Sequence, residues 1–297
     1  MKIKINKTKK VLITLCLILV LAPIVNSQYT DTKDVIARVN ITDAFPEMVS
    51  VVVDDPITLT GGGIKTVTCN ASVRDWGGWE NIEYANATLY HTFDSSHEDV
   101  DSLDYHYTNS SCENYDNDGE YIALYTCSFQ VAYHATNGNW TCNVTARNNG
   151  TFIDSLSNTT TINELYALNV TSLIDYGELA VLDTSEEVNA TITNFGNMAI
   201  NISVEGYGET PGDGQGLICN SGSNDIDVYY QRFSTTPFED YGLKIPLDTL
   251  PQDLGITLPK PTQSTAPVTN TTYWQLEVPM NPFGLCEGFI RFTAYAP

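Results

Sequence analysis

The stretches VTCNASV (Val67–Val73) and NWTCNVTA (Asn139–Ala146) decide the fold that we expect. In each stretch apolar residues alternate with polar ones, which is the pattern of a β-strand with one face in a core. Cys69 and Cys142 fall on the apolar faces, 73 residues apart in the chain. The two stretches therefore predict two strands of one all-β domain.

Outward from these stretches, short runs rich in Val, Ile, Thr and Tyr alternate with Gly, Asn, Asp and Pro clusters, and no segment has a helical period. In the first half we expect strands at 48–60, 64–74, 82–92, 121–134, 140–147 and 151–161. In the second half we expect strands at 166–170, 177–182, 188–193, 198–204, 225–232, 272–278 and 288–294. This spacing is typical of β-sandwiches.

The pattern restarts at Leu165, so we predict two consecutive β-sandwich domains, 46–164 and 165–297, after an N-terminal strand or linker at 28–45. Within the second domain, NFGN (194–197) is interpreted as the turn of a hairpin. The Pro- and Thr-rich stretch 259–269 is expected to be a surface loop.

The first predicted domain resembles an immunoglobulin-like sandwich, in which a cysteine of strand B is bonded to one of strand F. This resemblance implies a bond between Cys69 and Cys142. Trp140 stands where such domains usually place the tyrosine of the tyrosine corner. A corner hydrogen bond would therefore come from an indole N–H.

The TNFGN stretch (193–197) resembles the T-N-x-G-N hairpin of CARDB-type domains. Together with WTC (140–142) and CEGFIRFTA (286–294), it makes the chain similar to the secreted Ig-like plus CARDB-like surface proteins of archaea. The resemblance implies a β-sandwich fold. By analogy with exported sandwiches of surface layers, pili and adhesins, it also implies a structural or adhesive role.

Residues 1–27 have the form of a secretory signal peptide. Five lysines precede an apolar run at 11–25, and small residues then allow cleavage before Gln28. The run is short for a bilayer span, so we expect no membrane span after cleavage, with a retained anchor as the alternative. Cys16 is expected to be removed with the leader.

Six cysteines remain after cleavage, and an even number in an exported chain predicts three disulfides, with 15 formal pairings. With Cys69–Cys142 implied by the Ig-like resemblance, Cys112 and Cys127 close a local loop in the same domain. Cys219 and Cys286 are the two cysteines of the second half and are expected to pair.

The mature chain also has more Asn-x-Ser/Thr sequons than its composition predicts by chance, which indicates an N-glycosylated protein. The twelve acceptor residues are Asn40, Asn70, Asn86, Asn109, Asn139, Asn143, Asn149, Asn158, Asn169, Asn189, Asn201 and Asn270.

The charge of the chain narrows the class of partner. The leader holds five Lys and no acidic residue, so 9 Lys and Arg remain against 36 Asp and Glu. Such a surface repels nucleic acid and attracts divalent cations. Nucleic-acid binding is excluded on this ground.

Calcium is the one cofactor that the sequence suggests. Asn114, Asp116 and Asp118 place oxygen side chains at alternate positions before Gly119, as in cation-binding loops. The twelfth position of an EF-hand would be Glu, whereas this chain has Tyr125. The alternative is a polar hairpin tip.

The stretch HEDVDSLDYH (97–106) is dense in metal-ligand types, but Asp101 stands where HExxH needs its second histidine. An exposed acidic loop is the favoured interpretation. Trp76 and Trp79 are a candidate sugar platform, with core and sheet-edge packing as the alternative.

No complete catalytic motif is present, so we expect no enzyme. The glycine-rich GDGQG (212–216) lies between predicted strands with no helix to follow, and we interpret it as a loop.

The start of the mature chain carries a predicted strand of its own. Val35, Ala37, Val39 and Ile41 fall on one face of it, and Ile36, Arg38, Asn40 and Thr42 on the other. Because 48–60 already supplies the first strand of the Ig-like domain, this half-buried strand is surplus. It is expected to pair with its own second sheet, stay loose, or add to a sheet edge of a neighbouring subunit.

Together these features predict a secreted, cell-surface glycoprotein with a structural or adhesive role. Its expected partners are other extracellular proteins or copies of itself. The alternative is a carbohydrate- or calcium-dependent binding module, and a more remote one is an enzyme with an unrecognised site.

Overall fold

The computed structural model describes residues 32–41, 43–221 and 224–297. The chain divides into two units, Met1–Thr42 and Asp43–Pro297. The predicted signal peptide lies outside the described residues. Elsewhere the described chain is built of antiparallel sheets with two single-turn 3₁₀ helices, which confirms the all-β prediction.

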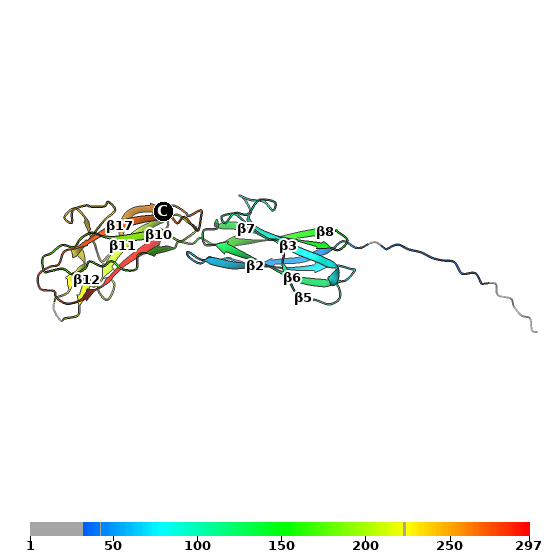
Figure 1. The fold of residues 1–297 in the computed structure, drawn as a ribbon, viewed down its shortest axis with the longest axis horizontal. Helices are drawn as coiled ribbons and strands as arrows, with labels where there is room; N and C mark the ends of the chain where they lie inside the picture. Colours follow the sequence, from blue (N-terminus) through cyan, green and yellow to red (C-terminus); the bar gives the residue numbers. More distant parts are fainter. Residues whose placement is uncertain (1–31, 42, 222–223) are drawn as a thin grey trace, which may run out of the picture. The chain divides into compact units, whose positions relative to one another are not determined.

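The first half of Asp43–Pro297 is a sandwich of two four-stranded sheets, visible as two layers in Figure 1. One sheet has the order β1-β2-β6-β5 and the other has the order β4-β3-β7-β8. The elements are β1 (Glu47–Val53), β2 (Ile64–Arg74), η1 (Trp79–Asn81), β3 (Ile82–His91), β4 (His106–Asn109), β5 (Glu113–Asn117), β6 (Ile122–Ala132), β7 (Gly138–Asn148) and β8 (Ile153–Ile162).

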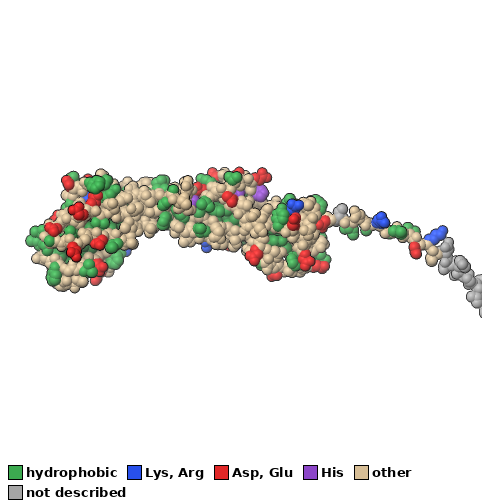
Figure 2. Space-filling model, in the orientation of Figure 1, with side chains coloured by type: hydrophobic (Ala, Val, Ile, Leu, Met, Phe, Trp, Pro, Cys, Tyr) green, Lys and Arg blue, Asp and Glu red, His purple; other side chains and the backbone are tan. Residues whose placement is uncertain are grey.

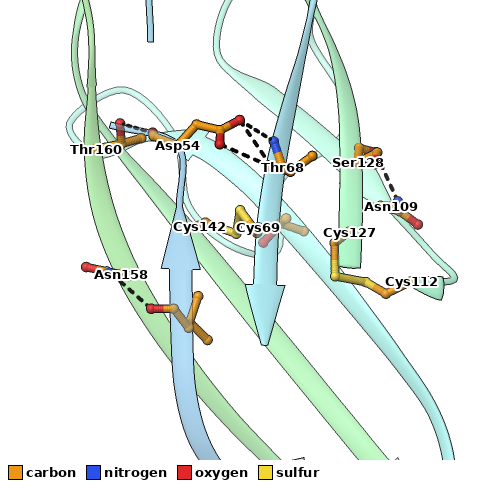
Figure 3. Close-up of a disulfide and its surroundings, with 12 residues drawn as sticks. Asp54, Thr68, Cys69, Asn109, Cys112, Cys127, Ser128, Cys142, Asn158 and Thr160 are labelled. Atoms are coloured by element: carbon orange, nitrogen blue, oxygen red, sulfur yellow. Dashed lines mark hydrogen bonds between the residues drawn. A yellow bond between two sulfur atoms is a disulfide. The ribbon is translucent and has the colours of Figure 1, made fainter. Parts of the chain in front are cut away.

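A disulfide joins the two sheets of this sandwich through its core. Cys69 of β2 and Cys142 of β7 are fully buried and bonded (Figure 3). Cys112 and Cys127 form a second bond. Trp140 is also fully buried, and its indole N–H donates to the carbonyl oxygen of Thr136 at 2.7 Å. Both bonds and the indole hydrogen bond agree with the expectation from the Ig-like resemblance.

The second half contains one five-stranded sheet and two three-stranded sheets, of which the last has the shortest strands. Their orders are β15-β14-β17-β10-β9, β16-β11-β19 and β13-β12-β18. The elements are β9 (Leu168–Val170), β10 (Val188–Asn194), β11 (Ile200–Tyr207), β12 (Gln215–Cys219), β13 (Ile226–Asp227), η2 (Val228–Tyr230), β14 (Gln231–Ser234), β15 (Ile245–Pro246), β16 (Gln252–Leu258), β17 (Thr269–Leu276), β18 (Cys286–Glu287) and β19 (Phe289–Tyr295).

The core of this half is centred on Trp274, which is fully buried against Phe233 at a ring separation of 5.2 Å. The third predicted disulfide, Cys219–Cys286, lies in a separate apolar cluster with Ile226. The sequence boundary at 164/165 stays a prediction, although the two halves have hydrophobic cores of their own.

The hairpin predicted at NFGN is wrong. β10 pairs with β17 and β9, whereas β11 pairs with β16 and β19, so the turn carries the chain from one sheet to the other. The side-chain amide of the buried Asn194 stabilises this turn between the sheets, which forms an arch. Its Nδ2 donates to the carbonyl oxygens of Met198 and Pro259, and its Oδ1 accepts from Gly196 N. A Cβ on Gly196 would lie 2.0 Å from Leu165 O, so this turn requires glycine.

Four other strand predictions differ from the structure. The strand predicted at 48–60 ends at Val53, as β1. Residues 177–182 lie outside the strands, and 225–232 is interrupted by η2. The half-buried strand predicted from Val35 is absent from the described residues 32–41, which belong to no sheet and are exposed. An edge strand needs a neighbour, and within the described chain this segment has none.

Candidate functional site

The second half contains an open groove where the edges of its two larger sheets meet. β9, which has only three residues, is an edge strand of the five-stranded sheet, and β19 is an edge strand of the β16-β11-β19 sheet. Among the described residues, no strand pairs with the second edge of β19. Ile290, Phe292 and Ala294 of β19 are therefore packed against the core but only partly buried.

The groove has a volume of about 1030 Å³. It is lined by residues 170–181, 282–290 and 292, together with Leu217, Ile226, Gln231, Leu276 and Val278.

The groove exposes large apolar side chains along both walls. Leu173 is 68 % exposed on one wall, and Leu285 and Phe289 are 62 % and 57 % exposed on the other. Contiguous exposed apolar residues of this kind usually mark a binding surface. Tyr176 donates to Gln231 Oε1 at 3.2 Å, and burial raises the pKa of its hydroxyl, so the wall stays uncharged there.

Covalent and steric features fix the second wall. The Cys219–Cys286 bond anchors its middle to β12. A Cβ on Gly288 would lie 2.0 Å from Gly216 O, so glycine lets the wall approach β12 closely. Sequence reasoning missed this groove, and the one available signal was the shortness of the apolar run at 166–170.

The three calcium candidates lie on a β-hairpin rather than in a loop that wraps around a cation. Asn114 and Asp116 belong to β5 and pair with β6, and Asp118 begins the turn that follows. All three side chains are exposed. Within the described ranges, no group of three or more His, Cys, Asp or Glu is gathered closely enough to hold a metal ion. Calcium binding stays a prediction.

The histidines and acids of 97–106 are distributed over separate contacts. His106 Nδ1 lies 3.2 Å from Asp101, and His97 Nδ1 lies 3.1 Å from the Thr88 hydroxyl. Asp104 contacts the buried His134 at 3.1 Å. These residues are not brought together around a common point.

The two candidate sugar-stacking tryptophans have different environments. Trp79 is half-buried against the core of the first sandwich, as the packing alternative predicted. Trp76 is 62 % exposed, with Tyr121 at a ring separation of 5.6 Å and the Arg74 guanidinium 5.3 Å from its ring centroid. Arg74 thus occupies one face of this ring.

In the glycine-rich stretch 212–216, the carboxylate of Asp213 is hydrogen-bonded to nearby backbone N–H groups. Asp213 accepts backbone N–H groups from Gly208, Glu209, Thr210 and Gln215 at 2.8–3.1 Å. These are the donors that a phosphate would need. Residues 212–214 lie outside the strands, as expected for a loop, whereas Gln215 and Gly216 already belong to β12.

The titration of Asp213 is a first prediction. The backbone N–H of Thr210 is the largest cause that lowers its pKa from 3.8 to about 2, and the other three N–H groups add to it. A depressed pKa stabilises the fold above pH 3.8, and this contribution is lost as the pH falls to about 2. The amide signals of Thr210 and Gln215 should titrate in NMR with a midpoint near pH 2. They should lose this transition in Asp213→Asn, and a midpoint near 4 would contradict the loop geometry.

The surface agrees with two further sequence observations. None of the twelve sequon asparagines is buried; Asn158, for example, is exposed on β8 (Figure 3). Acidic side chains are spread over the face in view in Figure 2, with few Lys or Arg among them. The residues that the structure describes include no helix long and apolar enough to cross a membrane.

Comparison with known protein families finds no family that matches this sequence, and comparison with curated proteins finds no matching sequence. Solved structures give distant matches. One is a protein of the CsuC–CsuE chaperone–tip adhesion subunit pre-assembly complex from archaic chaperone-usher Csu pili of Acinetobacter baumannii. It has 10 % identity and a TM-score of 0.42, and the match covers 82 % of this chain and 99 % of that one.

A second match is a carbohydrate-binding module of the β-sandwich superfamily, with 12 % identity, a TM-score of 0.25 and coverage of 86 % and 97 %. A third is the C-terminal domain of the Streptococcus agalactiae AgI/II polypeptide BspA, with 9 % identity, a TM-score of 0.20 and coverage of 84 % and 97 %. At these TM-scores the matches bring no function to this chain.

Proposed function

We propose that this chain is an extracellular cell-surface glycoprotein with a structural or adhesive role, which works through protein–protein contacts. The observation that carries the proposal is the apolar groove beside the unpaired edge of β19 in a disulfide-bonded, all-β chain. We further propose kinship with the secreted Ig-like plus CARDB-like surface proteins of archaea, on the three sequence stretches that carry that resemblance.

The covalent structure supports an extracellular location. All six cysteines outside the leader are paired, and such bonds persist in oxidising compartments. The sequon asparagines are all accessible at the surface, as a glycan acceptor must be. The apolar leader at 1–27 would direct the chain across the membrane.

The groove supports protein contacts over catalysis. An open sheet edge offers unpaired backbone N–H and C=O groups in a row, and adjacent apolar pockets accept alternate side chains. An extended segment of another protein fits both requirements. A small polar substrate would leave the exposed Leu173 and Leu285 in water.

The proposal predicts the fate of the chain expressed with its own leader in a host with an N-glycosylation pathway. We expect it in the medium or on the cell surface, without free thiols and with a mass well above that of the polypeptide. Intact mass spectrometry before and after enzymatic deglycosylation, with thiol counting, measures all three. A cytosolic chain with reduced cysteines would contradict an extracellular role.

A further inference from the structure

Residues 35–41 form no strand and carry large apolar side chains that are exposed within their own unit of the chain. Val35 is 88 % exposed, Val39 78 % and Ile41 84 %. Ile36 is 88 % exposed as well, and large apolar side chains are unfavourable in water, so four of them within seven residues require an explanation.

The sequence of this segment is that of a strand with one apolar face. Val35, Ala37, Val39 and Ile41 point to one side when the backbone is extended, while Ile36, Arg38 and the sequon residue Asn40 point to the other. A strand in this register would bury its apolar face and leave a glycan on Asn40 in solvent. A shift by one residue would bury Arg38 and Asn40 instead.

The groove of the second half has the complementary features. β19 is seven residues long, as is the segment from Val35 to Ile41, and its second edge pairs with no strand among the described residues. A strand added there would complete the β16-β11-β19 sheet and cover the partly buried Ile290 and Phe292. It would also cover Leu173, which the groove exposes.

The charges of the two partners are opposite. The groove walls carry Asp175, Glu178 and Glu287, and no Lys or Arg is among the lining residues. Arg38 is the one charged side chain of the segment, and in its flank the charge of Lys33 is balanced by Asp34. Opposite charge favours encounter and fixes register, chiefly at low ionic strength.

We infer that residues 35–41 of one copy insert as a strand beside β19 of a second copy, with Val35, Ala37, Val39 and Ile41 in the groove. This inference rests on the proposed function and names its partner as the same chain. Backbone hydrogen bonds to β19 would give affinity, and the alternating side chains would give register.

Four exposed positions allow a matched test in the full exported chain. Val39→Asp charges the inserting face, and Ile36→Asp places the same charge three residues earlier on the opposite face. Leu173→Asp charges the groove. Its control is Leu250→Asp, because Leu250 is 69 % exposed, as Leu173 is at 68 %, and does not line the groove. Circular dichroism checks that each variant is folded.

Sedimentation over a range of protein concentrations measures association. We expect wild type, Ile36→Asp and Leu250→Asp to associate as concentration rises. Val39→Asp and Leu173→Asp should lose at least ~100-fold in association constant, the order expected when a charge is forced into an apolar site. A mixture of these two variants should form a one-to-one complex, because one retains an intact groove and the other an intact segment.

Several results would overturn the inference. Wild type could stay monomeric at all concentrations, Ile36→Asp could dissociate like Val39→Asp, or the mixed variants could remain monomers. A groove filled by its own chain would give a compact monomer whose protease protection at 35–41 is independent of concentration and lost in Val39→Asp. Secretion, thiol content and mass are measured on the same samples, so the failure of self-insertion is distinguishable from the failure of the proposed function.

Discussion

Lys244→Met is expected to lower the free energy of unfolding by about 3–5 kcal/mol, which is the usual cost of leaving a buried charge without its partner. Lys244 is 2 % exposed, and its Nζ lies 2.6 Å from Glu187 Oε2. The Glu187 side chain is itself only 15 % exposed, so water would replace the ammonium group only in part, and the N–H of Phe238 at 3.1 Å would be its remaining donor. Urea unfolding of both proteins measures the difference.

The matched control is the double variant Lys244→Met/Glu187→Leu. Replacing both members of a buried pair by apolar residues is often close to neutral, so most of the lost stability should return. The pair would instead be energetically minor if Lys244→Met cost less than about 1 kcal/mol, the range of exposed ion pairs.

Removing the inter-sheet disulfide is expected to have an effect of similar size. In the chain-entropy model, a bond across the 73 residues between Cys69 and Cys142 contributes about 4 kcal/mol, and Cys69→Ala/Cys142→Ala loses it. Both residues are 0 % exposed, so the deleted sulfur atoms also leave unfilled volume in the core. Thermal and urea unfolding should both report the loss.

The shorter bond supplies the comparison. Cys112 and Cys127 enclose 15 residues, for which the same model gives about 3 kcal/mol. We therefore expect Cys112→Ala/Cys127→Ala to remain the more stable of the two double variants. The reverse order would mean that loop length does not determine the contribution of these bonds.

The sequence predicted most of the first sandwich because local and long-range signals agree there. In β2 and β7 the strict alternation around Cys69 and Cys142 sets which face is buried, and the bond then sets which strands oppose each other. Gly61–Gly63 precede β2, which begins at Ile64 as predicted, whereas β1 ends at Val53 rather than at Thr60.

The second half was predicted less well because its pairings depend on distant segments. Alternation on both sides of NFGN is the same in a hairpin and in an arch between sheets. The buried Asn194 amide decides between them by donating to the carbonyl oxygen of Pro259, 65 residues away. A single sequence contains no sign of that contact.

The candidate site followed the same division. The segment that we propose to insert, 35–41, could be recognised from its own alternation, because period and polarity are local properties. Its acceptor could not, since the groove exists only where β9 ends after Val170 and β19 has no second neighbour among the described strands. The three calcium candidates do not surround a common point, because alternate polar residues fit a strand as well as a cation-binding loop, and Asn114 and Asp116 pair with β6 as part of a strand.

The two long disulfides have a mechanical consequence for the proposed structural role at a cell surface. Under tension, a chain lengthens by about 3.3–3.6 Å for each residue that unravels. The Cys69–Cys142 bond joins residues 73 positions apart and so prevents roughly 250 Å of extension, and Cys219–Cys286 joins residues a further 67 positions apart. While both bonds are oxidised, the residues inside the two loops add nothing to the length of a stretched molecule, whereas a reducing environment would release them.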